Sequence, residues 1–193
     1  MTFQAFVFKN RGLLLSLPAG VLALCGRPSG SSIALGLPLA FAGELIRCWA
    51  VGYSGVTTRN DAVTAPKLVT GGPYAYVRNP LYLGNFLTAA GFAIAFTGEN
   101  SRFARRALVG GSLGAMAAIY ATIVPHEEEF LKSSFGEAFE RYRACVPRLV
   151  PRIVPLANAE GEWQPDAILR AESRTFALFG AMLGALVVRA RRT

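Results

Sequence analysis

The chain has 193 residues, of which 52% are hydrophobic and 17% are charged, and its formal net charge at pH 7 is +8. Such an apolar composition is unusual for a water-soluble domain and predicts a membrane protein. A nucleic-acid partner could use the positive charge, but the basic residues stand beside the ends of apolar runs and no RNA-reading or zinc-finger motif accompanies them. We therefore expect membrane anchoring and no nucleic acid.

Five apolar runs follow one another along the chain, with the charged residues almost entirely between them. The runs cover residues 13–25, 33–53, 81–96, 107–124 and 176–188. A helix needs about 20 mostly apolar residues to cross a bilayer, so the second and fourth runs qualify alone and the first and last need their flanks. The sequence predicts an all-α, multi-pass integral membrane protein with about five transmembrane helices.

The first run is preceded by a short apolar stretch at residues 3–8, and Lys9 and Arg11 separate the two. No A-x-A cleavage site follows, so we expect the first run to be a retained anchor rather than a signal peptide.

Cysteine and histidine are too sparse for a metal centre. Cys25, Cys48 and Cys145 show no C-x-x-C spacing, and His126 is the only histidine. Cys25 and Cys48 fall within apolar runs, where buried, inert thiols are usual. We expect no disulfide framework and no metal, and a Ser-His-Asp triad would have to be built around His126.

Two polar segments should meet on one membrane face. If the third and fourth runs form a hairpin joined by residues 97–106, the segments 54–80 and 125–174 lie on the same side. Basic clusters at residues 102–106 and 189–192 argue for the opposite face, but the two segments carry most of the Lys and Arg, which makes their face cytoplasmic by the positive-inside tendency. These basic residues include Arg59, Lys67, Arg78, Lys132, Arg141, Arg143, Arg148 and Arg152.

The second polar segment has a helical pattern. Apolar and aromatic residues recur there at three- and four-residue steps over residues 127–142, which predicts either an interfacial helix or a continuation of the fourth span. Pro147, Pro151 and Pro155 should end that helix, and residues 157–166 are polar and turn-rich.

Some residues inside the runs allow two interpretations. Glu44 and Arg47 stand three apart on one helix face, either as a functional pair at membrane depth or as a packing pair near the interface. The spacings Gly110 to Gly114 and 180 to 184 let helices approach closely, and we expect packing within one bundle rather than dimerisation.

The segment LVTGGPYAYVRNPLYLG, residues 68–84, is neither a clean helix nor a clean strand. Gly71, Gly72 and Pro73 break the backbone, and a helix can begin at Pro80 with Asn79 as its N-cap. Irregular backbone and a positive helix end at the membrane surface suit a polar ligand, whereas a simple loop anchored by its tyrosines and an arginine is the alternative.

Within this segment, GPYAYVRNPLYLG resembles the G-x-Y-x-x-x-R-H-P-x-Y-x-G signature of the isoprenylcysteine carboxyl methyltransferase family, which is related to the membrane phospholipid methyltransferases. The second polar segment is similar to the partner motif E-E-x-x-L-x-x-x-F-G-x-x-Y-x-x-Y-x-x-x-V-P of that family. Its matching residues are Glu127, Glu128, Leu131, Phe135, Gly136, Phe139, Tyr142, Val146 and Pro147. The resemblance covers roughly residues 44–155.

The resemblance implies a single membrane domain over residues 1–193, with a catalytic core at 54–155 and a linker and last transmembrane helix at 156–193. It implies an S-adenosylmethionine cofactor, a lipophilic acceptor entering from the bilayer, and no metal, because the methyl donor is already activated. The cofactor-contacting positions fall on Lys67, Leu68, Val69, Tyr74, Asn79, Pro80, Leu81 and Tyr82, with Glu127 holding the cofactor's ammonium.

Two further residues are candidates in the second motif. Arg148 could contact an anionic headgroup or the cofactor carboxylate, and Glu128 could contact the substrate or pair with an arginine such as Arg78 or Arg148. The sequence assigns no catalytic residue.

The chain departs from the family pattern at two positions. Asn79 replaces a histidine, so that side chain keeps its hydrogen bonding but loses a base. The prenylcysteine enzymes have an arginine for the substrate carboxylate one turn before the glutamates, where Ile123 stands here. A phospholipid amine, an isoprenoid or another hydrophobic metabolite therefore fits at least as well as a prenylcysteine carboxylate.

Two other classes remain open. Intramembrane sterol reductases, which bind NADPH, resemble the carboxyl-terminal half of the family, and a non-catalytic membrane scaffold is possible. No G-x-G-x-x-G follows a strand-like run, so a soluble dinucleotide-type fold is not expected.

Overall fold

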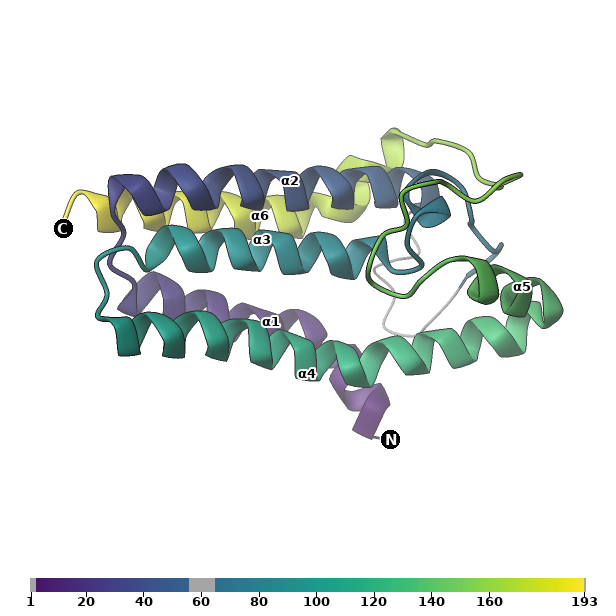
Figure 1. Cartoon of the computed structure of the whole chain (residues 1–193), viewed down its shortest axis with the longest axis horizontal. Coiled ribbons are helices and arrows are strands. Elements are labelled where there is room, and N and C mark those ends of the chain that lie inside the picture. Colours follow the sequence, from purple (N-terminus) through teal and green to yellow (C-terminus); the bar gives the residue numbers. More distant parts are fainter. Residues whose placement is uncertain (1–2, 56–64, 193) are drawn as a thin grey trace.

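The computed structural model describes residues 3–55 and 65–192 of the chain. Within these ranges the chain forms helices and loops and no strand, which confirms the all-α prediction (Figure 1). Arg59, predicted to lie on the cytoplasmic face, falls outside the described residues. The elements are α1 (Phe3–Cys25), α2 (Gly30–Ser54), the 3-10 helix η2 (Gly72–Ala75), α3 (Pro80–Phe96), α4 (Arg102–Phe135), α5 (Glu137–Cys145) and α6 (Asp166–Ala190).

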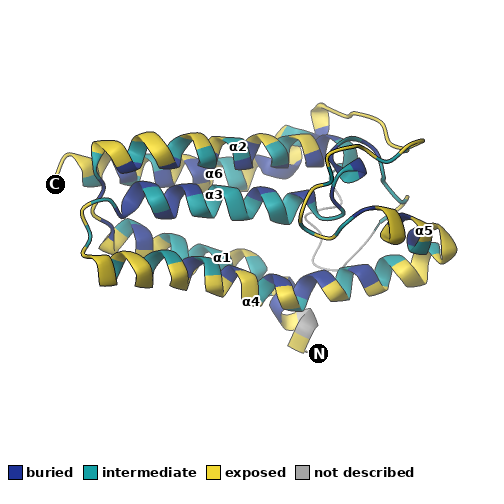
Figure 2. Cartoon of the chain, in the orientation of Figure 1, coloured by how far each residue is buried: buried dark blue, intermediate teal, exposed yellow. Residues whose placement is uncertain are grey.

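Four of these helices are long and apolar enough to cross a bilayer by length and composition. They cover Phe6–Cys25, Gly30–Ser54, Arg102–Phe135 and Pro165–Ala190, and α3 is a shorter apolar helix of 17 residues. At about 1.5 Å per residue, α3 is about 25 Å long, a little less than a bilayer core. Exposed residues line the outer faces of α2 and α4 (Figure 2). Large apolar side chains such as Leu35, Leu45 and Phe103 are among the exposed residues of these helices, as expected of helices that face lipid.

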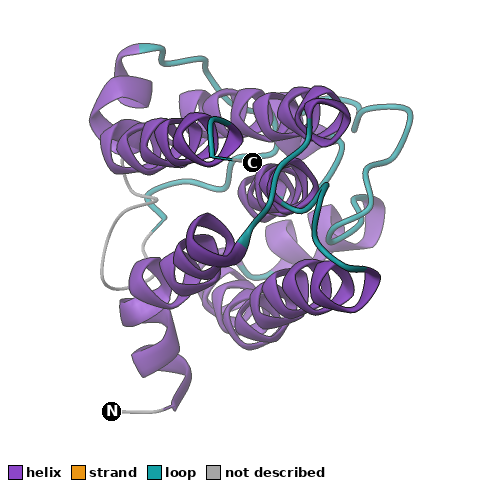
Figure 3. Ribbon diagram, turned by 90° about the vertical axis from the view of Figure 1, so that its left-hand side faces the viewer, coloured by secondary structure: helices purple, strands orange, loops and turns teal. Residues whose placement is uncertain are grey.

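The helices run side by side along one axis. α2 packs against α3 and α6, and α1 packs against α4. α3 also contacts α1 and α4, so it links the two sets of helices. The view along the bundle shows the long helices nearly end-on (Figure 3). A core of Leu22, Phe92, Phe96, Phe179 and Met182 joins α1, α3 and α6.

Glycines bring α2 and α3 into backbone contact. A Cβ at Gly43 would meet the carbonyl of Gly84, and a Cβ at Gly91 would meet the backbone of Gly36 and Ala40. Such small-residue contacts drive close helix packing in membranes.

The glycine pairs predicted to pack inside the bundle do not do so. A Cβ at Gly110, Gly114, Gly180 or Gly184 would meet no atom within 4 Å, so that prediction is wrong. Glycine spacing alone could not show which glycines contact a neighbouring helix. In the structure the close contacts come from glycines seven residues apart, Gly36 and Gly43 on α2 and Gly84 and Gly91 on α3.

The first helix includes the charged pair. α1 is continuous from Phe3 to Cys25, so the apolar stretch at residues 3–8 and the first run belong to one helix, and the run gains length from its flank as expected. The Arg11 guanidinium lies over the Phe8 ring, 3.9 Å from the ring centroid. Phe8 and Val7 in turn pack against Ile123 of α4.

The cysteines lie apart from one another and none forms a disulfide in the described part of the chain. Cys48 is half-buried, as its place in an apolar run suggests, but Cys25 is exposed, so the prediction of a buried thiol is wrong there. Cys25 is the last residue of α1, where the helix end leaves its side chain outside the core.

Both polar segments lie at one end of the bundle, here called the polar end: residues 65–79, α5 and the loop 146–165 (Figure 1). Backbone hydrogen bonds join them, from the Arg78 N–H to the Pro147 carbonyl at 2.9 Å and from the Arg152 N–H to the Tyr76 carbonyl at 3.0 Å. The predicted meeting of the two segments is confirmed. α4 continues the fourth span to Phe135, and Gly136, with a φ of 51°, turns the chain into α5.

Candidate active site

One large cavity opens at the polar end and runs into the bundle. Its volume is about 920 Å³, at the upper end of the roughly 300–1,000 Å³ typical of ligand sites. All five long helices contribute to its lining. Its deep part is apolar and includes the buried residues Leu22, Phe92, Met116 and Met182.

The residues that sequence analysis assigned to a cofactor all line this one cavity. They come from the loop before η2, from η2, from the start of α3 and from α4, and the fold brings them to its polar mouth. They are Lys67, Leu68, Val69, Tyr74, Asn79, Pro80, Leu81, Tyr82 and Glu127. The two residues assigned to the substrate, Glu128 and Arg148, are not part of the lining.

The glycine pair at the start of η2, Gly71 and Gly72, lets the chain at the mouth pack closely against its neighbours. Gly72 has a φ of 58°, and a Cβ there would meet the ring of Tyr53. The N–H groups of Thr70 and Gly71 both donate to the carbonyl of Glu160, at 2.9 and 2.7 Å. The irregular backbone predicted at this point is therefore fixed against α2 and against the loop before α6.

α3 begins at Pro80, as predicted, but the Asn79 side chain makes no capping hydrogen bond. Its amide instead donates to the Arg148 carbonyl at 3.1 Å and to the Glu128 carboxylate at 3.5 Å. The N-cap prediction is right for the position and wrong for the side chain, because a buried acceptor on another element competes for the amide.

Glu128 clasps the two motifs together. Its buried carboxylate accepts from the Arg78 guanidinium at 3.0 Å and pairs with Arg148. Arg78 also donates to the Arg143 and Val146 carbonyls, at 3.0 and 2.5 Å. The alternative in which Glu128 pairs with an arginine is thus the one that the structure shows. The pKa of Arg148 is raised, mainly because its side chain donates a hydrogen bond to the Glu128 carboxylate.

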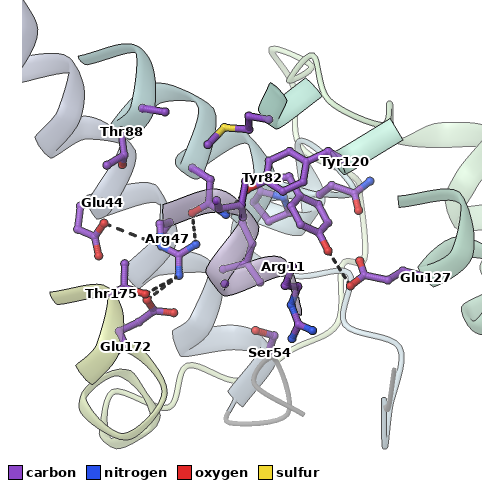
Figure 4. A pocket seen from close by; sticks show the side chains of 18 of the residues that line it. Arg11, Glu44, Arg47, Ser54, Tyr82, Thr88, Tyr120, Glu127, Glu172 and Thr175 are labelled. Atoms are coloured by element: carbon purple, nitrogen blue, oxygen red, sulfur yellow. Dashed lines mark hydrogen bonds and ion pairs between the residues drawn. The ribbon is translucent and has the colours of Figure 1, made fainter. Parts of the chain in front are cut away.

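Glu127 lies one residue earlier and faces the cavity instead. Its carboxylate accepts a 2.7 Å hydrogen bond from the Tyr82 hydroxyl of α3 (Figure 4). The Tyr82 ring packs against Tyr120 of α4, with the ring centroids 4.4 Å apart and the ring planes tilted by 50°. One carboxylate and two aromatic faces are therefore presented to a ligand from adjacent helices.

Two phenols support the mouth from the polar side. The Tyr142 hydroxyl of α5 donates to the Tyr74 carbonyl at 2.8 Å. Burial raises the pKa of Tyr74 to about 12, although a hydrogen bond with Ser54 lowers it in part, and burial also raises the pKa of Tyr142. Both phenols stay protonated near neutral pH, and the Tyr142 hydroxyl acts as a hydrogen-bond donor.

A second polar group lies deeper, and sequence analysis identified only part of it. Arg47 donates to Glu172 of α6 at 2.6 Å, to Thr175 at 3.3 Å and to Asn85 of α3. The predicted partner Glu44 is farther away, with 3.9 Å between Arg47 Nε and Glu44 Oε2. Asn85 continues the network by donating to the Tyr120 hydroxyl at 2.6 Å.

Signals for the missed residues were present in the sequence. Asn85 and Tyr120 are polar groups within apolar runs, which mark functional candidates in membrane helices. Glu172 stands just before the last run, and its distance of 125 residues from Arg47 conceals the contact. Only the packing of α2 against α6 brings these two together.

Other expectations concern single positions. Ile123 is fully buried against Val7 and Phe8 and does not line the cavity. His126 packs edge-on against Phe8, with 6.4 Å between the ring centroids. In the part of the chain that the structure describes, no cluster of three His, Cys, Asp or Glu residues could hold a metal ion.

Comparison with known proteins identifies the family of this helical membrane protein. Residues 31–138 match the family model of phospholipid methyltransferases. Because that match covers more than half of the chain, the protein belongs to the phospholipid methyltransferase family.

Three relatives show how far the likeness extends. The chain is 34% identical over 129 residues to the cobalt-zinc-cadmium resistance protein CzcN of Cupriavidus metallidurans, covering 67% of this chain and 51% of the relative. It is 36% identical over 86 residues to the protein-S-isoprenylcysteine O-methyltransferase of Schizosaccharomyces pombe, covering 45% and 34%. It is 29% identical over 122 residues to protein-S-isoprenylcysteine O-methyltransferase B of Arabidopsis thaliana, covering 60% and 57%. The chain thus matches only about a third to somewhat more than half of each relative.

Proposed function

We propose that the protein is an S-adenosylmethionine-dependent methyltransferase whose acceptor is a lipophilic molecule from the bilayer. One observation carries this proposal: Glu127 and the segment 67–82 converge on one large cavity in a chain of the phospholipid methyltransferase family. A methyl transfer from an activated donor mainly requires that donor and acceptor be held in line. A rigid mouth and a continuous cavity suit that task.

The residues at the mouth fit the cofactor. The Glu127 carboxylate suits the cofactor's ammonium, and Lys67 offers a cation for its carboxylate. The Tyr82 face is available to an adenine or a sulfonium. When bound, S-adenosylmethionine would supply an electrophilic methyl group, while the Tyr82 hydroxyl holds the Glu127 carboxylate in place. No metal is needed for this chemistry.

The acceptor would occupy the apolar depth of the cavity, which is lined by Leu22, Phe92, Met116 and Met182. Two of the relatives are named for methylation of an isoprenylcysteine. In this chain, the apolar Ile123 is buried away from the cavity and supplies no cation for a carboxylate. A phospholipid amine, an isoprenoid or another lipid therefore remains preferable to a prenylcysteine carboxylate.

The mouth would face the cytoplasm. The polar end carries Lys67, Arg78, Lys132 and the basic residues of α5 and the following loop, and such an excess marks the cytoplasmic side. The donor would then enter from the cytosol and the acceptor from lipid.

The test is transfer of a labelled methyl group. The purified protein in lipid nanodiscs is incubated with methyl-tritiated S-adenosylmethionine and a membrane lipid extract, and label is counted in the organic phase. We expect label with the wild-type chain and with Glu129→Ala, whose side chain is exposed, and none with Glu127→Ala. Absence of label, together with lipid-dependent oxidation of NADPH, would favour the reductase; absence of both would favour the scaffold.

A further inference from the structure

The Glu44–Arg47 pair faces the cavity well inside the bundle. Arg47 lies seven residues before the end of α2, which places it about 10 Å below the polar end. The side chains of Arg47 and Glu44 are only 8% and 10% exposed, yet both line the cavity (Figure 4). The pair therefore stands between the proposed cofactor mouth and the apolar depth.

The guanidinium of Arg47 is not completely satisfied. Its two terminal nitrogens donate to Asn85, Glu172 and Thr175. Its Nε is buried and has no hydrogen-bond partner among the described residues. Glu44 Oε2, at 3.9 Å, is beyond hydrogen-bond distance. A buried N–H without an acceptor destabilises a protein, so a ligand atom that accepts this bond would be favoured.

The charges on either side define what that ligand group must be. It has to accept from the Arg47 Nε–H, and it gains further if it donates to Glu44, whose carboxylate offers several acceptor sites. A hydroxyl does both. A carboxylate or phosphate would accept from Arg47 but would be repelled by Glu44 and Glu172, whereas an ammonium could donate to Glu44 but not accept from Arg47.

The body attached to this hydroxyl must be apolar. Below the pair, the cavity is lined from α3 and α6 by Ala89, Phe92, Leu178 and Phe179. A long or ringed hydrocarbon fits there, because it replaces contact with lipid by contact with these side chains.

We propose that Glu44 and Arg47 form a subsite for the hydroxyl group of a lipophilic molecule, a membrane alcohol or phenol. Arg47 Nε donates to the hydroxyl oxygen, and the hydroxyl proton is donated to Glu44. That this molecule is the methyl acceptor rests on the proposed function; the subsite itself does not.

The first test uses binding to the wild-type chain in nanodiscs. Four probes with the same isoprenoid chain carry an alcohol, its methyl ether, a primary amine or a carboxylic acid, and each is titrated calorimetrically with and without S-adenosylhomocysteine. We expect the alcohol to bind most tightly. The methyl ether, which accepts from Arg47 but cannot donate to Glu44, should bind about tenfold more weakly.

The second test uses variants. Glu44→Gln should weaken binding of the alcohol about tenfold because the charged acceptor is lost. Glu137→Gln, at a 93% exposed side chain of α5, is the matched control and should change nothing. Thermal unfolding of each variant shows whether it is folded, and this readout does not depend on the proposed cofactor. The probe series on the wild-type chain needs no variant.

The outcomes separate the two proposals. Tighter binding of the amine or the acid than of the alcohol would overturn the subsite, as would equal binding of alcohol and ether that Glu44→Gln leaves unchanged. Binding of S-adenosylhomocysteine without binding of the alcohol also overturns the subsite and leaves the proposed function standing. Glu44-dependent binding of the alcohol without binding of S-adenosylhomocysteine supports the subsite and rejects the methyltransferase.

Discussion

The hydroxyl of Tyr82 donates a 2.7 Å hydrogen bond to the carboxylate of Glu127 and so joins the two sequence motifs, 45 residues apart, at the mouth of the cavity. Tyr82 comes from the first turn of α3 and Glu127 from the last third of α4. The contact fixes the direction of the carboxylate that we assign to the cofactor's ammonium. The clasp formed by Glu128 holds the same two motifs from the other side.

Removal of the Tyr82 hydroxyl tests this support. We expect Tyr82→Phe to bind S-adenosylhomocysteine about tenfold more weakly than the wild-type chain, because hydrogen bonds to charged groups contribute about 1.5–3 kcal/mol. Calorimetric titration measures the change. Tyr76→Phe is the control, since Tyr76 does not line the cavity. Equal affinities in the two variants would show that Glu127 does not depend on Tyr82.

The Glu128 clasp should matter for stability. Glu128→Gln leaves the guanidinium of Arg78, whose side chain is 10% exposed, without its carboxylate. Breaking such a buried pair from one side costs about 3–5 kcal/mol, and the contribution of the half-exposed Arg148 should be smaller. Thermal unfolding in detergent should show a clear loss, whereas Glu137→Gln, in an exposed pair with Arg141, should shift the midpoint little. Similar midpoints for both variants would contradict the clasp.

Two glycine substitutions test the packing of α2 on α3. In Gly91→Ala the new methyl group would meet backbone atoms of Gly36 and Ala40, which cannot move as a side chain can. We expect a loss of about 1–3 kcal/mol. Gly110→Ala meets no atom within 4 Å and should be neutral, or up to about 1 kcal/mol more stable through helix propensity. The opposite order in a thermal unfolding series would refute the close contact.

The pKa of Tyr74 gives a prediction for alkaline pH. Since its pKa is raised from 10 to about 12 by burial, the folded protein favours the protonated phenol. This stabilisation is complete below pH 10 and is lost as the pH rises from 10 through 12. Ultraviolet difference titration of the wild-type chain against Tyr74→Phe should show one phenolate forming near pH 12. A difference spectrum with its midpoint near pH 10 would mean that Tyr74 is open to solvent.

The sequence was sufficient for the outline because apolar length and charge position are local properties. Five apolar runs predicted the long helices, and the hairpin of the third and fourth runs correctly placed residues 67–82 and Glu127 at one end. The two motifs supplied the mouth residues through resemblance, and all nine line the cavity. Their contact with a cofactor stays a prediction.

The remainder depends on which helix faces which. The pairing of Arg47 with Glu172 needs α2 beside α6, and a sequence pattern within one helix points to Glu44 instead. Likewise, glycine spacing cannot show whether a helix face meets a neighbour or lipid, which is why Gly110 and Gly180 were assigned wrongly while Gly43 and Gly91 were missed.

The most direct measurement is calorimetric titration of the purified protein with S-adenosylhomocysteine, comparing the wild-type chain, Glu127→Ala and Glu129→Ala. Glu127 lines the cavity, and Glu129 is the exposed carboxylate two residues later on the same helix. We expect saturable binding to the wild-type chain and to Glu129→Ala, and loss of binding in Glu127→Ala. Wild-type binding that survives Glu127→Ala, or no binding to the wild-type chain, would contradict the cofactor site.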